Sequence, residues 1–361
     1  MPPKIELIPI RVPMTEPFRI SSGSVDSKES ILVRIEDDGL IAWGEASPMS
    51  GAFYSIDTPE STLAFLREEA IPRWESAGHP GPEFVSEQLR NSEGNRFGWA
   101  GFEGALWDLQ LQREGRSFFE AFGGETKPIE SGLAVGIYPT IEQLVERCHH
   151  YLEEGYKRLK IKIEPGWDVE PLRAIRSEFP SLPLMVDANA AYRREHFSLL
   201  DALDEFDLMM IEQPLTAEDL EGHAELQSRI STPVCLDESA ESPAKVREAI
   251  ELGSCQIVNI KIQRVGGLSA ARAIHDLCAQ EGIANWMGTM PELGIASLHA
   301  LYLATLPNCL YPTDVESSAR WFQEDIIDPP IEVKEGLIQL APEHTKRPRV
   351  DEERVERWRV G

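Results

Sequence analysis

Five ionisable residues recur at an almost constant spacing in the middle of the chain. They are Lys162, Asp187, Glu212, Asp237 and Lys261, and the intervals between them are 25, 25, 25 and 24 residues. Three carboxylates with an ammonium group on either side can hold a divalent cation and move a proton beside it. This combination suits the removal of a proton α to a substrate carboxylate, because a cation stabilises the enediolate that forms.

The three carboxylates Asp187, Glu212 and Asp237 are interpreted as ligands of one ion. Mg²⁺ prefers oxygen ligands and keeps positions open for water or substrate oxygens, with Mn²⁺ as the alternative ion. Without an ion, three neighbouring carboxylates would repel and one would hold a proton. A single acidic residue after a strand is more often a helix N-cap. Three at equal spacing, bracketed by lysines at the same period, favour metal binding.

Lys162 and Lys261 are the candidate catalytic residues, and they are predicted to face each other across the site. A lysine near a divalent cation and a second ammonium group has a lowered pKa, which makes it a usable base. Lys160 precedes Lys162 by two residues and therefore points to the same face of a strand, where it can neutralise the same oxyanion.

Each of the five residues follows a short apolar run that reads as a buried strand, and segments of helix length separate the runs. A strand with its returning helix takes on the order of 25–30 residues, so the period indicates a βα repeat. In a parallel (β/α)8 barrel the carboxyl ends of the strands form one rim, where catalysis takes place. The predicted strands are 133–137, 159–163, 184–186, 208–211, 234–236, 257–260 and 284–287, with an eighth ending near 310–312.

The first part of the chain has a different pattern. Strand-like runs at 5–12 and 31–46 precede helical segments at 58–77, 82–91 and 97–113. The predicted fold class is α/β, a (β/α)8-type barrel with an α+β capping domain built from the N-terminal segment and the C-terminal tail. The expected boundaries are 1–125 for the capping domain, 126–321 for the barrel and 322–361 for the returning tail, which contains a hairpin around 334–336.

A polar, glycine-containing segment at 17–24 predicts a mobile loop after the first strand. We expect this loop to close over substrate, with Ser22 as a substrate contact. A plain connector is the alternative.

Composition excludes several classes of partner. The formal charge of −26 argues against nucleic acid and against an anionic membrane surface. No apolar run approaches the roughly 20 residues of a membrane-spanning helix, and the N-terminus lacks the pattern of a signal peptide. The five cysteines form no CxxC pair, which is typical of reduced thiols in a cytoplasmic protein. The expected partner is a small-molecule carboxylate, and homo-oligomerisation is left open.

Several motifs resemble the muconate-lactonising branch of the enolase superfamily, in which a Lys or His base works with Mg²⁺ on an ene-diolate. They are Lys160-Ile161-Lys162, Asp187-Ala188-Asn189, Glu212-Gln213-Pro214, Asp237-Glu238-Ser239 and Lys261, with Gly44-Glu45-Ala46, Ala105-Leu106-Trp107-Asp108 and Gly123-Gly124 in the expected capping domain. Residues 162–168, 258–261, 264–267 and 317–320 are similar to the o-succinylbenzoate synthase and N-succinylamino acid racemase group.

The resemblance implies a metal-dependent lyase that dehydrates a cyclohexadiene carboxylate in menaquinone synthesis. Lys162 would abstract the α-proton and could return it to the leaving hydroxyl, while Lys261 would stay protonated and stabilise the enediolate. Racemisation of an N-succinylamino acid uses the same intermediate with one lysine on each face. One site therefore suits both reactions, and the racemase or a related epimerase is the alternative. A barrel that has lost catalysis and acts as a scaffold is an alternative of another class.

The chain departs from the family pattern at several pocket positions. Residues 288–294 read Gly-Thr-Met-Pro-Glu-Leu-Gly, where the family usually has Gly-Gly-Met-x-Glu-Thr-Gly, and Ala134 stands where Ser is frequent. Thr289 and Met290 are therefore expected to line the substrate pocket.

Three further residues are candidate substrate contacts. Glu292 is interpreted as a partner behind Lys261, with a rim carboxylate as the alternative. Asp314, with Glu316, is loosely similar to the acidic pair that binds a substrate ammonium in dipeptide epimerases. Asn189 is either a turn residue or a partner of substrate or lysine.

Overall fold

A computed structural model describes residues 2–20, 23–49, 55–91 and 94–361. Within them, seven strands form one parallel sheet in the chain order that the repeat predicts. The strands are β5 (Leu133–Val135), β6 (Leu159–Lys162), β7 (Leu184–Asp187), β8 (Ile211–Glu212), β9 (Val234–Leu236), β10 (Ile257–Ile260) and β11 (Ala284–Met287). Neighbouring strands in the sequence are neighbours in space, as short right-handed βα connections require.

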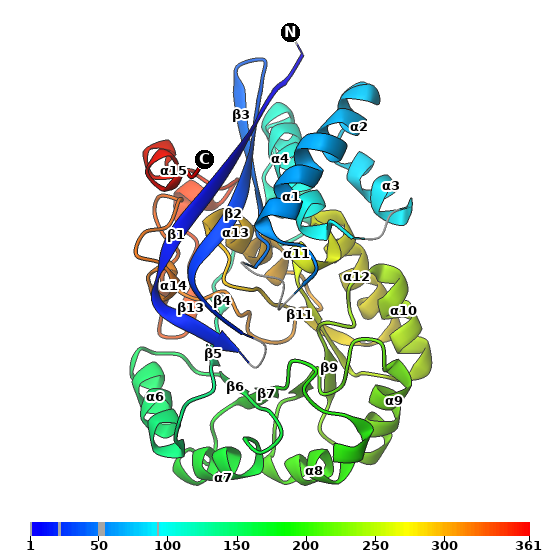
Figure 1. Cartoon of the computed structure of the whole chain (residues 1–361), viewed down its shortest axis with the longest axis vertical. Helices are drawn as coiled ribbons and strands as arrows, with labels where there is room; N and C mark the ends of the chain where they lie inside the picture. Colours follow the sequence, from blue (N-terminus) through cyan, green and yellow to red (C-terminus); the bar gives the residue numbers. More distant parts are fainter. Residues whose placement is uncertain (1, 21–22, 50–54, 92–93) are drawn as a thin grey trace.

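Helices cover the outer side of this curved sheet (Figure 1). Their Leu, Ile and Val side chains pack against the strands, and nearly all residues of the seven strands are buried. The helices are α6 (Ile141–Glu153), α7 (Val169–Glu178), η2 (Arg194–His196), α8 (Phe197–Ala202), η3 (Leu203–Phe206), α9 (Leu220–Arg229), α10 (Pro243–Leu252), α11 (Ile262–Val265), α12 (Leu268–Glu281) and α13 (Gly294–Ala304).

The expected eighth strand is not a regular strand. The segment after α13 instead makes isolated parallel bridges to both edges of the sheet, one from Cys309 to Asn285 and one from Thr313 to Ser131. Pro312 lies between the two bridges and has no N–H to donate to a ladder. The parallel sheet is therefore a seven-stranded, barrel-like structure whose edges are linked through single bridges.

The N-terminal part begins with an antiparallel sheet of β1 (Lys4–Ile20), β2 (Gly23–Asp37) and β3 (Leu40–Ala46). Both β1 and β2 are longer than predicted, because pairing resumes at Phe18 and Val25 after an irregularity. Most of the expected 17–24 loop is thus strand, and Ser22 lies outside the described residues. The long hairpin of β1 and β2 extends from the N-terminus of the chain toward the parallel sheet (Figure 1).

Helices then pack on this N-terminal sheet, and α4 makes the closest approach. A Cβ at Gly44 would lie 2.0 Å from the carbonyl oxygen of Gly101, and a Cβ at Gly101 would lie 2.4 Å from the nitrogen of Ala46. Glycine at both positions lets the α4 backbone lie directly on β3. The helices are α1 (Pro59–Phe65), the π-helical turn η1 (Leu66–Ala70), α2 (Ile71–Ser76), α3 (Glu83–Asn91), α4 (Arg96–Glu114) and α5 (Phe118–Phe122).

The C-terminal tail contacts both parts of the chain. Its hairpin of β12 (Val333–Lys334) and β13 (Leu337–Ile338) pairs with β4 (Ile129–Glu130), just before the parallel sheet. The end of the tail reaches the N-terminal sheet, where Arg359 forms an ion pair with Glu6. The remaining helices are α14 (Ser318–Trp321), η4 (Pro342–His344) and α15 (Glu352–Trp358).

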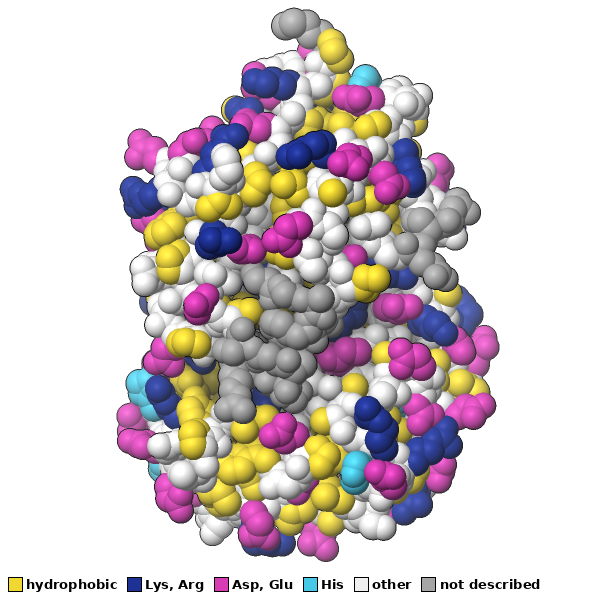
Figure 2. All heavy atoms as spheres, in the orientation of Figure 1, with side chains coloured by type: hydrophobic (Ala, Val, Ile, Leu, Met, Phe, Trp, Pro, Cys, Tyr) yellow, Lys and Arg dark blue, Asp and Glu magenta, His cyan; other side chains and the backbone are white. Residues whose placement is uncertain are grey.

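The negative charge is not gathered into one patch on the face drawn in Figure 2, where acidic side chains alternate with basic ones. Among the described residues, no helix combines the length and the apolar character needed to cross a bilayer. The five cysteines are all described and are all free thiols, as predicted.

Glu103 of α4 is completely buried at the contact between α4 and α12, where its Oε2 accepts a hydrogen bond from the Ser269 amide. Burial raises the pKa of Glu103 to about 7. Because this pKa exceeds that of an unfolded chain, the stability that the protonated form contributes is lost as the pH rises through about 7. Replacement Glu103→Gln should remove this loss, which amounts to about 1 kcal/mol between pH 6 and pH 9.

Urea unfolding at several pH values measures this effect. Glu114→Gln is the matched control, because Glu114 is exposed at the end of the same helix. An equal pH dependence of unfolding in the wild type and in Glu103→Gln would contradict the assignment.

Candidate active site

The three predicted metal ligands lie together at the carboxyl ends of neighbouring strands. Lys162 pairs in register with Asp187, and Asp187 with Glu212, across β6, β7 and β8. Glu212 pairs with Cys235 of β9, so Asp237, two residues further on, points to the same side. Asp187, Glu212 and Asp237 are fully buried. Parallel register therefore gathers the carboxylates, as the 25-residue period predicts.

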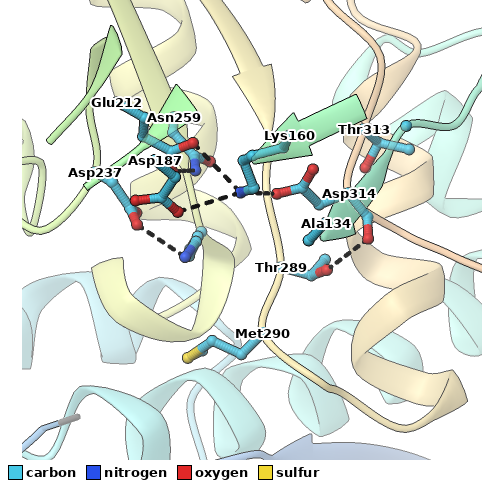
Figure 3. A network of polar contacts seen from close by, with 12 residues as sticks. Ala134, Lys160, Asp187, Glu212, Asp237, Asn259, Thr289, Met290, Thr313 and Asp314 are labelled. Carbon is cyan, nitrogen blue, oxygen red and sulfur yellow. Dashed lines mark hydrogen bonds and ion pairs between the residues drawn. The ribbon is translucent and has the colours of Figure 1, made fainter. Parts of the chain in front are cut away.

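Lys160 lies between two groups of carboxylates (Figure 3). Its Nζ is 3.3 Å from Glu212 Oε2 and 3.6 Å from Asp187 Oδ2, and it contacts Asp314 on the other side. The ammonium group also lies 5.2 Å from the centre of the Trp286 ring. Burial lowers the pKa of Lys160, but the surrounding carboxylates outweigh burial and raise it above the ordinary lysine value. Lys160 is thus a permanent cation.

Lys162 is held by two oxygen acceptors. Its Nζ is 2.6 Å from Asp187 Oδ2 and 2.6 Å from Asn189 Oδ1. Asn189 adopts φ 41°, a left-handed conformation that asparagine tolerates well, and its amide nitrogen donates to Asp187 Oδ1. Its side chain also donates to Glu238. Asn189 is therefore both a turn residue and a lysine partner, and the two interpretations left open by the sequence both apply.

Lys261 occupies the opposite flank of the carboxylates. Its Nζ is 2.8 Å from Asp237 Oδ2, and Arg264 contacts the other oxygen of the same carboxylate. Both cations come from the end of β10 and the short helix α11, which starts immediately after Lys261. The two lysines thus make their contacts with different carboxylates, Lys162 with Asp187 and Lys261 with Asp237.

The carboxylates differ in their protonation equilibria. Burial raises the pKa of Asp187, but the charges of Lys162 and Lys160 outweigh it and hold this pKa below the usual range. Burial, followed by the charge of Asp187, raises the pKa of Glu212 to about 8. The direction of the Glu212 shift agrees with the expectation that, without an ion, one of three neighbouring acids holds a proton.

The three carboxylates fit a divalent cation in chemical type, because they are buried oxygen donors at the ends of neighbouring strands. In the described conformation they contact ammonium groups. Among the described residues, no three His, Cys, Asp or Glu side chains are placed to hold one ion. The identity of any ion and its ligand set therefore remain predictions.

A small cavity opens beside this cluster. One wall carries the ammonium groups of the three lysines and the amide of Asn189. The opposite wall is mostly apolar, with Met290 below Lys160 in Figure 3. The other lining residues are Met49, Ala134, Thr289, Pro291, Asp314, Glu316 and Trp321. Such a cavity suits a small molecule with an anionic end and a carbon-rich end.

Thr289, Met290 and Asp314 line the cavity, and their contact with substrate stays a prediction. Thr289 Oγ1 donates to the backbone oxygen of Asp314 over 3.3 Å. Glu292 is buried, and its role as a partner behind Lys261 stays a prediction. Burial, then the charge of Glu45, raises the pKa of Glu292 to about 8, and Lys28 opposes this more strongly than Lys261 does. Ser22 lies outside the described residues.

The sequence interpretation missed two side chains that orient the cluster. Asn259 Nδ2 donates to Glu212 Oε1 over 2.8 Å. Arg158 is 2% exposed, and one of its NH2 groups donates to Asp314 Oδ1 over 3.0 Å. Arg158 precedes Lys160 by two residues, and Asn259 precedes Lys261 by two. Strand alternation places each on the same face as a recognised residue, and this is the signal that could have found them.

Known proteins resemble the chain over nearly its whole length. The Mandelate racemase / muconate lactonizing enzyme N-terminal domain model matches residues 4–123, and the enolase C-terminal domain-like model matches residues 143–344. An o-succinylbenzoate synthase of Geobacillus kaustophilus is 43% identical over 350 residues, covering 97% of this chain and 93% of that protein. An N-succinylamino acid racemase of Thermus thermophilus is 39% identical over 359 residues, covering 98% and 96%. The solved structure of an enolase superfamily member from Listeria innocua has a TM-score of 0.93 at 33% identity, covering 99% and 96%.

The geometry yields a prediction for metal binding. Glu212→Gln removes one of the three carboxylates, so it should weaken binding of Mn²⁺ at least tenfold. It should also abolish most of the thermal stabilisation that millimolar Mg²⁺ gives. An ion at 100 times its Kd stabilises the folded state by about 2.7 kcal/mol. Titration calorimetry and thermal unfolding measure the two effects.

Glu195→Gln is the matched control, because Glu195 is exposed and its side chain is 80% accessible. Unchanged Mn²⁺ affinity in Glu212→Gln would remove Glu212 from the ligand set.

Proposed function

The chain belongs to the mandelate racemase and muconate lactonizing enzyme family of the enolase superfamily, and we propose that within it the protein is a divalent-metal-dependent o-succinylbenzoate synthase. The reaction is the dehydration of a cyclohexadiene carboxylate through removal of the proton α to its carboxylate. Relatives of about 40% identity that carry this name support the proposal. The observation that carries it is the pair Lys162 and Lys261, which line one cavity from either side of three buried carboxylates.

Each residue has a distinct task in this reaction. Lys162, released from Asp187, takes the α-proton and is the nearest group to return a proton to the departing hydroxyl. Lys261 stays protonated, with Asp237 beside it, and stabilises the enediolate oxygen. Lys160 adds a fixed positive charge to the same region. A divalent cation held by Asp187, Glu212 and Asp237, Mg²⁺ or Mn²⁺, would bind the substrate carboxylate and offset its growing charge.

The far side of the cavity favours a carbon-rich substrate over a dipeptide. Met290 and Trp321 contribute apolar surface there. Asp314, the candidate for binding a substrate ammonium, is already neutralised by Arg158 and Lys160. Burial raises the pKa of the remaining wall carboxyl, Glu316, to about 7. A substrate ammonium would therefore find little negative charge on this wall.

N-succinylamino acid racemisation is the second candidate function. The placement of one lysine on each flank of the carboxylates favours it, because racemisation needs a proton donor and acceptor on opposite faces of the α-carbon. A relative named N-succinylamino acid racemase, 39% identical to this chain, also supports it. An inactive scaffold is less well supported, because the five predicted charged residues lie at neighbouring strand ends and two of them, Lys162 and Lys261, line the cavity.

Substrate turnover separates these functions. The purified protein with Mg²⁺ should convert the cyclohexadiene precursor to o-succinylbenzoate, followed by the absorbance of the aromatic product. In D₂O, a racemase would incorporate deuterium at the α-carbon of an N-succinylamino acid, which NMR detects. Deuterium incorporation without dehydration would favour the racemase, and neither reaction would favour the scaffold.

Lys162→Met should lower kcat for the α-proton step at least 10³-fold, because it removes the base while preserving the length of the side chain. The expected loss corresponds to about 4 kcal/mol of transition-state stabilisation. Lys157→Met, at an exposed position just before the same strand, is the matched control and should retain wild-type activity. Equal activity in the two variants would rule out Lys162 as the base.

A further inference from the structure

The last residues of β3 make hydrogen bonds with two separate segments near the parallel sheet. One of these segments is helix α11, through the side chain of Gln263. The Gln263 Nε2 donates to the backbone oxygen of Glu45 over 2.8 Å, and its Oε1 accepts from the Ser47 amide over 2.9 Å. Gln263 is 1% exposed, so neither hydrogen bond is exchanged readily with water. The side-chain amide thus reproduces a pair of strand hydrogen bonds to the end of β3.

Gln263 is closely linked to Lys261 along the chain. Lys261 is the N-cap residue of α11, and its backbone oxygen accepts from the Val265 amide over 3.0 Å. Gln263 therefore lies inside the single turn that Lys261 begins, and Arg264, next to it, contacts Asp237. A helix of one turn has little stability of its own, so its orientation depends on tertiary contacts.

The second segment is the loop before α13, which carries Met290. The carboxylate of Glu45 accepts from the amides of Leu293 and Ala296, each over 3.0 Å. These amides belong to the start of the 11-residue helix α13, where a carboxylate is favoured by the helix dipole. The segment Glu45 to Ser47, which spans the end of β3, therefore fixes both α11 and the start of α13.

The same segment continues past β3 into the cavity wall. Lys28 Nζ donates to the backbone oxygens of Ser47 and Pro48, over 3.0 and 2.7 Å. The next residue, Met49, lines the cavity and packs with Met290 and Phe97. Positioning the end of β3 relative to α11 therefore also sets the distance between Lys261 and the apolar wall.

We propose that Gln263 is a positioning residue for the reaction, which orients Lys261 by hydrogen-bonding α11 to the backbone of Glu45 and Ser47. The inference rests on the proposed function for its catalytic consequence. An amide is needed at this position because one group must donate to a carbonyl and accept from an N–H at the same time. Neither a carboxylate nor an apolar side chain of equal length satisfies both partners.

Two variants test this inference. Gln263→Met keeps the length of the side chain and removes both hydrogen bonds. It should lower kcat about tenfold on the substrate that the wild type turns over, with KM changed less than threefold, because the substrate-binding groups remain. Gln263→Glu keeps the acceptor for the Ser47 amide and loses the donor, so its kcat should fall between those of the wild type and Gln263→Met. It also serves as the second measurement if Gln263→Met does not fold.

Gln256→Met is the matched control, because Gln256 is exposed just before β10, the strand that leads to α11, and the chemical change is identical. It should keep the wild-type kcat. Rates are expressed per folded molecule, at a temperature where circular dichroism shows each variant fully folded. A kcat for Gln263→Met within twofold of the wild type, or an equal loss in Gln256→Met, would overturn the positioning role.

Amide hydrogen exchange followed by mass spectrometry separates failure of this inference from failure of the proposed function. In Gln263→Met the amides of Ser47 and Val265 should exchange at least tenfold faster, while amides of β7 stay protected. This measurement needs no substrate. If the wild type turns over neither substrate, the proposed function fails, but the contact between Gln263 and the end of β3 can still be tested. Unchanged exchange rates of the Ser47 and Val265 amides in Gln263→Met would overturn that contact, whatever the enzyme turns over.

Discussion

The structure depends on charge compensation at one end of the parallel sheet, where several ionised side chains are buried together. Asp187, Glu212 and Asp237 are fully buried, and Asp314 nearly so. An isolated charge at such a position costs several kcal/mol, so each of these groups needs a cation or a hydrogen-bond donor. Lysine and arginine side chains from adjacent strand ends supply the cations in the described conformation. The arrangement is stable only as a set, because removing one member leaves a partner uncompensated.

The same electrostatic constraint explains how the site can be reactive. Lys162 and Lys261 are held against carboxylates that a divalent cation is suited to bind, so binding of a cation and release of the lysines would compete for the same oxygens. The fixed charge of Lys160, between Asp314 and Glu212, stays within the cluster in either case. Lys160 therefore offsets the carboxylate charge permanently, whereas Lys162 and Lys261 offset it only while they contact Asp187 and Asp237.

Much of this arrangement could be predicted from the sequence, because the side chains involved share one period. The strands that precede Asp187, Asp237 and Lys261 lie where the apolar runs indicate. The length of β1 and β2 and the lack of a regular eighth strand were not predicted, since both depend on pairing with distant segments. The interpretation of Glu292 as a partner behind Lys261 stays a prediction, but the groups that act most strongly on its pKa were not predicted. Lys28 and Glu45, which lie beside Glu292, come from strands about 250 residues away in the chain.

By itself, the sequence determined which strand ends carry the charges and that they share one rim, because a repeat of fixed length in a parallel sheet leaves the register little freedom. Only the tertiary structure decided which charges pair. Asp314 contacts Arg158 and Lys160, and the amide of Gln263 joins the backbone of β3. These contacts join residues up to 218 positions apart. Long-range packing brings them together, and no local pattern of residue types encodes it.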